Sequence, residues 1–179
     1  MAKIFNNSIG VLGGSFDPAH KGHLEISKIA IKKLMLSKVF WIVTKKNPFK
    51  KKPYFSVNQR LNQAKKITKN VKKIKVLFLD KTVKSSRSIN IINYLIIKKK
   101  PKIIYFIIGS DNLIRFHKWK SWKKIVKLSK LIVFSRKGYD RKGMKSTVAK
   151  NFKNRIIFIK NKPITISSTQ LKNGLKLDT

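Results

Sequence analysis

Two histidines, His20 and His23, lie in the segment GGSFDPAHKGH (residues 13–23), directly after the apolar stretch SIGVL. Residues three apart share one face of a helix, so both imidazole rings can face one anion at the entrance of a helix. A loop that enters a helix also presents backbone N–H groups and the positive end of the helix dipole, which together favour phosphate. The spacing therefore predicts a phosphate site where a helix begins, near Lys21 or Gly22.

The residues before the histidines shape the turn that carries them. Gly13 and Gly14 allow a tight turn and a close approach of a ligand to the backbone, because neither has a Cβ. Pro18 restricts Asp17 to an extended conformation. The segment lacks the Gly-Lys-Ser/Thr of a P-loop and the three-glycine dinucleotide fingerprint, so it is neither of the common nucleotide-binding loops.

Two other interpretations of the histidine pair stay open. A zinc site is one, but the sequence has no cysteine and only six acidic residues to supply further ligands. A glycine-rich turn with incidental histidines is the other, although the crowding of Gly, Pro, Asp and two His after an apolar run argues against it. We therefore expect no metal site built from protein ligands alone.

The elements that must position these residues follow from the hydrophobic pattern. Runs rich in β-branched and aromatic residues predict buried strands at 8–12, 38–44, 74–79, 103–108, 131–135 and 155–159. Apolar residues three or four apart, with lysines on the other face, predict helices at 22–36, 56–68, 89–99 and 121–129. The segment 98–102 predicts a turn from helix to strand, and residues 140–154 match no pattern clearly.

This alternation predicts an α/β fold, a Rossmann-like and mainly parallel sheet with helices on both faces, as a single domain over residues 1–179. In such sheets ligands bind outside the carboxyl ends of the strands, where the strand order reverses. The histidine segment follows the first predicted strand, so we expect it at that place.

The charge of the chain limits its possible partners. Its 179 residues include 44 Lys and Arg against six Asp and Glu, a formal net charge of +38, which favours phosphate-bearing partners and unspecific adhesion to nucleic acid at low salt. Most of the bases are lysines scattered along the chain, which favours a compositional bias over a dedicated nucleic-acid surface. A basic nucleic-acid-binding module remains the alternative that is not an enzyme.

Cysteine content and hydropathy indicate in which cellular compartment the protein acts. The absence of cysteine excludes disulfides and thiolate chemistry and agrees with a reducing compartment, so we expect a cytoplasmic protein. Apolar runs such as IIYFII (103–108) are far too short to span a bilayer, and the N-terminus has no secretory stretch with a cleavage site. We expect no membrane partner.

The segment GGSFDPAHKGH closely resembles the (T/S)FDPxHxGH signature of the nucleotidyltransferase superfamily, and the chain as a whole is similar to bacterial nicotinate-nucleotide adenylyltransferases. The resemblance implies transfer of AMP from ATP to nicotinate mononucleotide, which forms nicotinate adenine dinucleotide (deamido-NAD) and pyrophosphate in NAD biosynthesis. It implies that His20 and His23 are the catalytic pair at the ATP phosphates, with Mg²⁺ bound mainly through those phosphates. Nicotinamide mononucleotide or phosphopantetheine as the acceptor, or cytidylyl transfer, are the alternatives within the superfamily.

Six further segments resemble the family pattern in order: VTKKNPFK (43–50), SSRSINIINYL (85–95), IIGSDNL (107–113), FHKWKSW (116–122), VFSRKGY (133–139) and ISSTQLK (166–172). The residues that the resemblance implies for ATP are Gly13, Gly14, Ser15, Phe16, His20, His23, Gly109, Asp111, Arg136, Ser167, Ser168, Thr169 and Lys172. Those that it implies for nicotinate mononucleotide are Asn47, Lys50, Ser88, Trp119 and Arg136.

Several of these residues also have a purely structural interpretation. Trp119 and Trp122 could form an apolar helix stripe, Asp111 could cap a helix, and Arg136 could lie in a solvated turn. His117 matches no role, and we expect it at the surface.

Two departures from the family pattern concern the end of the chain. Lys172 stands where the family has an arginine, which keeps the charge but loses the bidentate grip on phosphate. The sequence ends shortly after Lys172, so we expect a short C-terminal end where the family continues with another helix. The sequence leaves the oligomeric state open.

Overall fold

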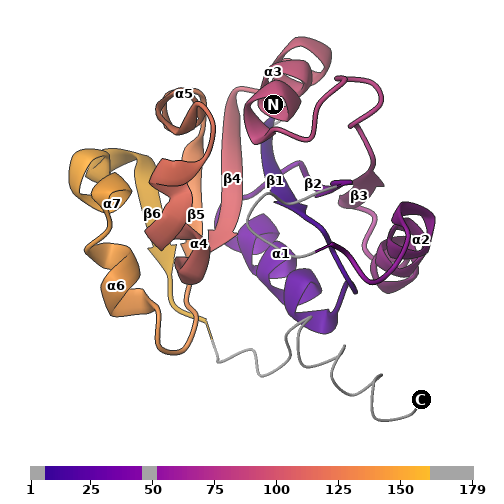
Figure 1. The fold of residues 1–179 in the computed structure, drawn as a ribbon, viewed down its shortest axis with the longest axis horizontal. Coiled ribbons are helices and arrows are strands. Elements are labelled where there is room, and N and C mark those ends of the chain that lie inside the picture. The colour runs from indigo at the N-terminus through magenta and orange to yellow at the C-terminus, as the bar shows by residue number, and fades with distance from the viewer. Residues whose placement is uncertain (1–6, 46–51, 162–179) are drawn as a thin grey trace, which may run out of the picture.

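The structure is a computed structural model that describes residues 7–45 and 52–161 (Figure 1). Six of the residues singled out from the sequence lie outside these ranges, and their predicted roles are not addressed by the structure. They are Asn47, Lys50, Ser167, Ser168, Thr169 and Lys172.

The described residues form one sheet of six strands, and each strand corresponds to a predicted one. The strands are β1 (Ser8–Gly14), β2 (Lys38–Val43), β3 (Ile74–Leu77), β4 (Ile103–Gly109), β5 (Lys130–Phe134) and β6 (Ile156–Ile159). All neighbouring pairs are parallel, in the order β3-β2-β1-β4-β5-β6. This order reverses between β1 and β4, which confirms the Rossmann-like fold and places the switch point at the end of β1.

The four longer helices also confirm the predicted periodicity. They are α1 (Lys21–Lys33), α2 (Val57–Thr68), α3 (Ser88–Lys99) and α5 (Trp122–Leu128). The sequence did not predict the short α4 (Ser110–Arg115), α6 (Asp140–Met144) and α7 (Thr147–Asn151), nor the 3₁₀ turns η1 (Phe116–Lys118) and η2 (Lys153–Arg155). Elements of one or two turns repeat the helical period too few times for it to be recognised.

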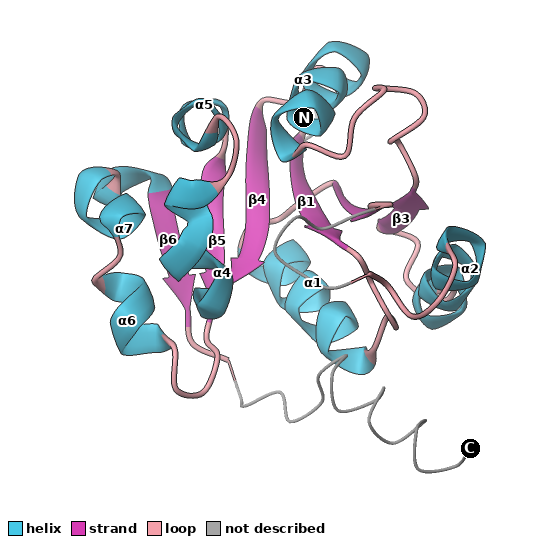
Figure 2. Cartoon of the chain, viewed as in Figure 1, coloured by secondary structure: helices cyan, strands magenta, loops and turns pink. Residues whose placement is uncertain are grey.

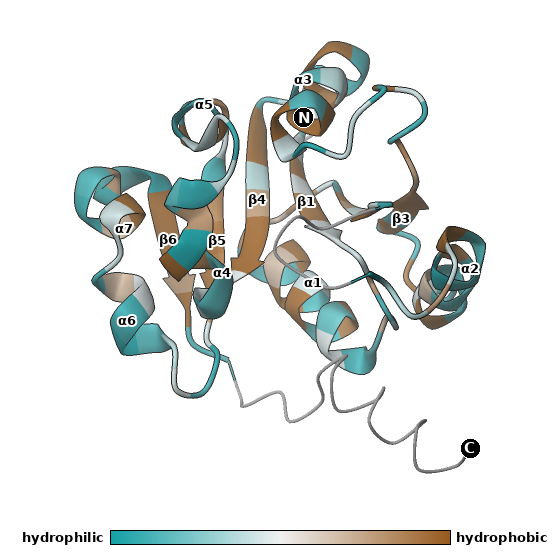
Figure 3. Cartoon of the chain, in the orientation of Figure 1, coloured by the Kyte–Doolittle hydropathy of each residue, from teal (hydrophilic) through white to brown (hydrophobic). Residues whose placement is uncertain are grey.

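Helices cover both faces of the sheet (Figure 2). Ile92 of α3 and Ile125 of α5 pack on one face with side chains such as Val11 of β1. Ala30 of α1 and Ala64 of α2 pack on the opposite face. The four inner strands β1, β2, β4 and β5 are mostly buried, while the edge strands β3 and β6 are partly exposed. The strands are strongly apolar, and the helices carry hydrophilic residues as well (Figure 3).

Local signals set the ends of the helices. Ser56 caps α2, because its hydroxyl accepts the Gln59 N–H at 3.2 Å while the Gln59 side chain accepts the Ser56 N–H at 2.9 Å. Helix α3 ends with Lys100 in the left-handed region at φ 44°, so the predicted turn at 98–102 is confirmed. Within the described ranges, no helix has both the length and the apolar character needed to cross a membrane.

Candidate active site

A pocket of about 760 Å³ lies at the carboxyl edge of the sheet, where the strand order reverses. Its walls come from the ends of β1 and β2, from Phe106 of β4, from the loop that enters α3, and from the segment between η1 and α5. The residues predicted from the sequence that line it are Gly13, Gly14, Ser88 and Trp119. Segments far apart in the chain thus meet where the sequence analysis expected a ligand.

The histidine pair stands at the start of α1, which begins at Lys21 as predicted. His20 is the N-cap residue, and its Nδ1 accepts the N–H of Gly22 at 3.1 Å. The Nδ1 of His23 in turn accepts the N–H of His20 at 3.3 Å, and the ring centroids lie 3.8 Å apart. The two rings therefore replace the serine and glutamate of an ordinary capping box.

This capping arrangement determines which ring nitrogens can donate. Because both Nδ1 atoms accept hydrogen bonds, each neutral imidazole carries its proton on Nε2. His20 is buried, at 6% exposure, and His23 is partly buried. Two Nε2–H donors at a helix N-terminus suit the oxygens of a phosphate chain.

Phe16 connects the glycines at the end of β1 to the histidines. Its backbone is left-handed, at φ 47°, and its buried ring lies 4.9 Å from the His23 ring and stacks on Trp41 at 5.0 Å. Phe16 and Trp41 belong to the core on the α1 and α2 face, whereas the pocket lies on the α3 and α5 face.

The tight turn predicted at Gly13 and Gly14 is not formed, because both residues are the last two of β1 and pair with Ile42 and Val43 of β2. This end of β1 lines the pocket and leads through Phe16 to the histidine pair.

The two tryptophans of the 116–122 segment differ in their surroundings. Trp119 stacks on Phe116 at 4.9 Å, meets Phe106 edge-on at 6.1 Å, and also lines the pocket. Trp122 packs edge-on against Phe152 at 5.6 Å and is not among the pocket residues. Trp119 is thus both a packing residue and a pocket wall, and only Trp122 has the purely structural surroundings.

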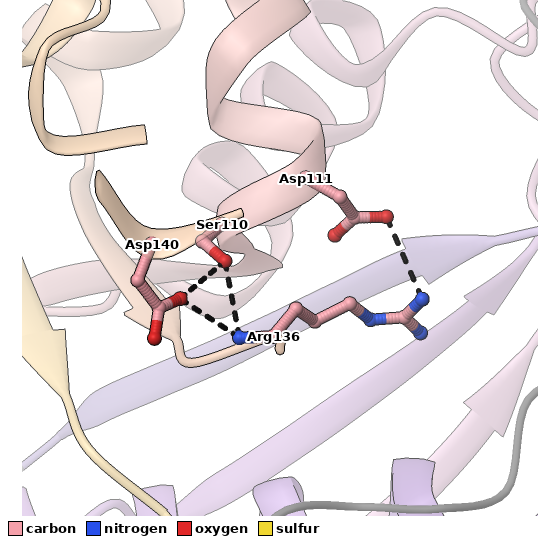
Figure 4. Close-up of polar contacts among 4 residues, drawn as sticks. All are labelled: Ser110, Asp111, Arg136 and Asp140. Carbon is pink, nitrogen blue, oxygen red and sulfur yellow. Dashed lines mark hydrogen bonds and ion pairs between the residues drawn. The ribbon is translucent and has the colours of Figure 1, made fainter. Parts of the chain in front are cut away.

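The ends of β4 and β5 are joined by a polar cluster of four residues (Figure 4). The Ser110 hydroxyl donates to Asp140 Oδ1 at 2.6 Å and accepts the Arg136 N–H at 3.1 Å. Asp140 Oδ1 also accepts the Arg136 N–H, at 2.9 Å. The guanidinium of Arg136 then reaches Asp111, with Nη1 3.6 Å from Oδ2.

Asp111 is not a helix cap, so that structural interpretation is wrong. The N-cap of α4 is Gly109, and Asp111 lies in the first turn, where it pairs with Arg136. Gly109 matters for this pairing, because a Cβ built there would collide with Asp111 Oδ1. Arg136 is exposed, but the same ion pair gives it a defined partner.

The cluster also affects the ionisation of Asp140. Burial disfavours its charged form, but hydrogen bonds from Ser110, the Arg136 N–H and Ser135, together with nearby Lys160, outweigh burial and lower the pKa of Asp140. The carboxylate is therefore held ionised as an acceptor for the loop that carries Arg136.

Sequence reasoning did not identify Ser110 and Asp140, nor Arg60 and Asp80, as residues of this edge. One signal was available in the composition, because the chain has only six acidic residues. Four of them follow the ends of strands β1, β3, β4 and β5: Asp17, Asp80, Asp111 and Asp140. In a chain so rich in lysine, retained carboxylates mark positions where an acceptor is needed.

His117 was expected at the surface, and that prediction is wrong. Its side chain is partly buried in η1, and its Nδ1 is buried without a hydrogen-bond partner among the described residues. The aromatic packing of Phe116 and Trp119 on either side draws the residue between them toward the core.

Comparison with known proteins shows the family. The chain belongs to the cytidylyltransferase-like family, whose model matches residues 11–174. It is similar to the "probable nicotinate-nucleotide adenylyltransferase" of Pelagibacter ubique, with 51% identity over 165 residues that cover 92% of this chain and 91% of that protein. The protein of the same description from Nitratiruptor is 40% identical over 134 residues, covering 73% of this chain and 75% of its own.

A solved structure shares the fold. It is the Plasmodium falciparum nicotinic acid mononucleotide adenylyltransferase complexed with NaAD, with a TM-score of 0.70, 20% identity, and coverage of 93% of this chain and 82% of that one. The resemblance to nicotinate-nucleotide adenylyltransferases that the sequence predicted is thereby confirmed by relatives and fold together.

Proposed function

We propose that this protein transfers AMP from ATP to nicotinate mononucleotide and so forms nicotinate adenine dinucleotide and pyrophosphate. The observation that carries the proposal is the arrangement at the carboxyl end of β1, where a pair of imidazoles at the start of α1 follows glycines that line a pocket of nucleotide size. The activity in the names of the relatives is the same, which supports the assignment.

Catalysis of this reaction depends on positioning of the two substrates more than on proton transfer. The nucleophile is a phosphate monoester whose second pKa lies near about 6, so at neutral pH it is already largely ionised. No protein base is needed, and the protein must hold two polyanions in line while the charge on the departing pyrophosphate is neutralised. We assign this task to the Nε2–H groups of His20 and His23, with His23 at the transferring phosphate.

The remaining residues are assigned to the two substrates as the resemblance to the family implies. Ser15 and Phe16 with the glycines at the end of β1, and Gly109, Asp111 and Arg136 at the end of β4 and β5, are proposed to hold ATP. Ser88 and Trp119 are proposed to hold nicotinate mononucleotide, with Arg136 between the two substrates. Outside the described residues, Asn47 and Lys50 are proposed for the acceptor, and Ser167, Ser168, Thr169 and Lys172 for the ATP phosphates.

A divalent metal is part of the proposal. In ranges 7–45 and 52–161, no group of three or more His, Cys, Asp or Glu side chains is placed to hold a metal ion. We propose that Mg²⁺ is bound mainly through ATP oxygens, where it would neutralise charge on the phosphates. The protein's own part would be the charges of Arg136 and Lys172 around the nucleotide.

We further propose that residues 1–179 form one nucleotidyltransferase domain that acts in the cytoplasm. The cysteine-free sequence agrees with a reducing compartment.

A pyrophosphate-release assay tests the function. Purified protein would receive ATP and Mg²⁺ with nicotinate mononucleotide, nicotinamide mononucleotide or phosphopantetheine in separate reactions. We expect release with nicotinate mononucleotide and much less with the other two acceptors. Absence of release with either pyridine mononucleotide, from protein shown to be folded, would refute the assignment, and a preference for the amide would correct the acceptor.

A further inference from the structure

Arg60, on the first turns of α2, is a buried arginine whose side chain is directed at backbone carbonyls. Its exposure is 1%. Nη1 donates to the carbonyl of Ser15 at 2.5 Å and to that of Thr44 at 2.8 Å, and Nε donates to the carbonyl of Phe55 at 3.1 Å. One planar guanidinium thus joins the loop after β1, the end of β2 and the loop before α2.

Of the three residues whose carbonyls Arg60 binds, Thr44 lines the pocket and Ser15 directly follows Gly14, which also lines it. Both the N–H and the hydroxyl of Thr44 donate to the carbonyl of Gly14, at 3.0 Å and 3.3 Å. Arg60 holds the next carbonyl along the chain, that of Ser15. The carbonyls of two consecutive residues, Gly14 and Ser15, are therefore each fixed by hydrogen bonds, the first from Thr44 and the second from Arg60.

Two carboxylates accompany the buried guanidinium. Burial lowers the pKa of Arg60, and the charges of Asp17 and Asp80 act in the opposite direction. Asp17 is itself buried, and its two oxygens accept the N–H groups of Tyr54 and Phe55, each at 2.9 Å. The charge of Arg60 is therefore compensated by groups that also hold neighbouring loops.

Asp80 extends the network to the acceptor side of the pocket. Its Oδ2 accepts the N–H of Lys45 at 2.7 Å and the hydroxyl of Ser86. Ser86 lines the pocket in the same loop as Ser88. The loops after β1, β2 and β3 are thus connected through three buried charged side chains.

We propose that Arg60, Asp17 and Asp80 form a positioning network. The network holds the Gly14–Ser15 segment at the end of β1 and the segment from Ser86 to Ser88 in the relative positions that in-line transfer requires. The network would make the placement of the ATP phosphates depend on that of the acceptor, without a direct contact between Arg60 and either substrate. This inference rests on the proposed function, because it concerns the alignment of its two substrates.

The first test is Arg60→Lys, which keeps the charge but cannot donate to three carbonyls in the geometry of the fork. We expect kcat to fall by about 10²-fold, as for a misplacement of about 1 Å, while the Kd for ATP alone changes much less. A role confined to charge balance predicts wild-type kcat for this variant.

The second test addresses the acceptor side through Asp80→Asn and Ser86→Ala. Either change removes part of the link between β2 and the loop that enters α3, so we expect KM for nicotinate mononucleotide to rise by about tenfold, with a smaller change in KM for ATP. Hydrogen exchange of the Lys45 amide in Asp80→Asn gives a readout that does not depend on activity, and we expect faster exchange.

Arg155 supplies the matched control. Its Nε donates to the carbonyl of Val126 at 3.2 Å and its Nη2 to that of Lys127, at the opposite end of the sheet. Arg155→Lys should change stability without changing kcat or either KM.

The outcomes separate the inference from the function. If wild-type protein is active and the folded Arg60→Lys, Asp80→Asn and Ser86→Ala proteins keep kcat and both KM values within twofold, the positioning network is refuted and the function stands. If Arg60→Lys does not fold, the other two variants decide. Inactive wild-type protein would instead refute the function, and the exchange of the Lys45 amide would still show whether the network orders the loops.

Discussion

The backbone N–H of His20 donates to Nδ1 of His23, while Nδ1 of His20 caps the same helix at Gly22. Each ring therefore has a structural task at Nδ1, and in its neutral form carries its proton on Nε2. A substitution that only shortens the side chain removes both tasks, so capping and catalysis must be separated by the choice of variant.

His23→Gln and His20→Asn make that separation. Glutamine at the third helix position and asparagine at the N-cap are both good capping residues, so α1 should remain intact. We expect turnover to fall by about two orders of magnitude or more for His23→Gln, because the glutamine amide keeps a donor but does not place it where the imidazole Nε2–H lies. Thermal unfolding and steady-state turnover measure the two effects.

His117→Asn is the control for this pair. It removes a partly buried histidine to which we assign no role, so turnover should stay close to that of the wild type even if stability changes. Unchanged turnover in a folded His23→Gln protein would show that the transfer does not need the imidazole of His23.

Trp119 and Trp122 form a natural matched pair. Trp119→Leu should raise KM for nicotinate mononucleotide by about tenfold, because stacking of a ring on an aromatic side chain contributes about 1–3 kcal/mol. Trp122→Leu removes the contact with Phe152 and should lower the melting temperature while leaving KM unchanged. Equal effects of the two changes on KM would contradict a stacking role for Trp119.

Asp140 should make stability depend on pH in the acidic range. Its folded-state pKa is lowered, so the stability that it contributes is fully present above the unfolded-state value of about 3.9 and is lost as the pH falls through the folded-state pKa. Asp140→Asn should therefore be less stable than the wild type at neutral pH, and the difference should shrink below about pH 4.

Urea unfolding from neutral to acidic pH measures this difference. Glu25→Gln serves as the control, because Glu25 only pairs with exposed Lys28, at 3.2 Å, and surface pairs of this kind contribute little. A gap between Asp140→Asn and the wild type that stays constant down to the lowest pH would show that the charge of Asp140 does not hold the loop.

The net charge of +38 should cause nucleic-acid binding of a purely electrostatic kind. Binding of a fluorescent RNA oligonucleotide should weaken by about 10³-fold or more between about 50 mM and 200 mM salt, without preference for sequence. A complex that resists this salt and prefers one sequence would reveal a dedicated nucleic-acid surface, which the scattered lysines do not predict.

Periodicity predicted those parts of the fold that repeat it often enough. Each strand of the described sheet and each of the four longer helices could be predicted, because a buried parallel strand is apolar throughout and a surface helix alternates every three or four residues. The helices between Ser110 and Asn151 other than α5 span one or two turns. Their positions are decided by packing, as with Val148 of α7 in the core.

The candidate site likewise has residues that local sequence patterns predict and residues that they do not. The histidine pair and the start of its helix could be placed from eleven consecutive residues, since an N-cap and a three-residue spacing are local properties. The glycines could not, because they extend β1 by pairing with β2 where a turn was expected. Ser110 and Asp140 are 30 residues apart, and Arg60 is 45 residues from Ser15. No spacing rule relates such residues, because their loops converge only after the parallel strands are aligned.

The sequence by itself determined the order of the strands and of the longer helices, the histidine pair at the start of α1, and the family. Tertiary structure alone decided that Trp119 lines the pocket while Trp122 does not, that Asp111 pairs with Arg136, and that Arg60 joins three loops. Hydrogen bonds and burial between distant segments exist only once the sheet brings the carboxyl ends of its strands to one edge, and this is why the residues that support the site could not be read from their neighbours in the chain.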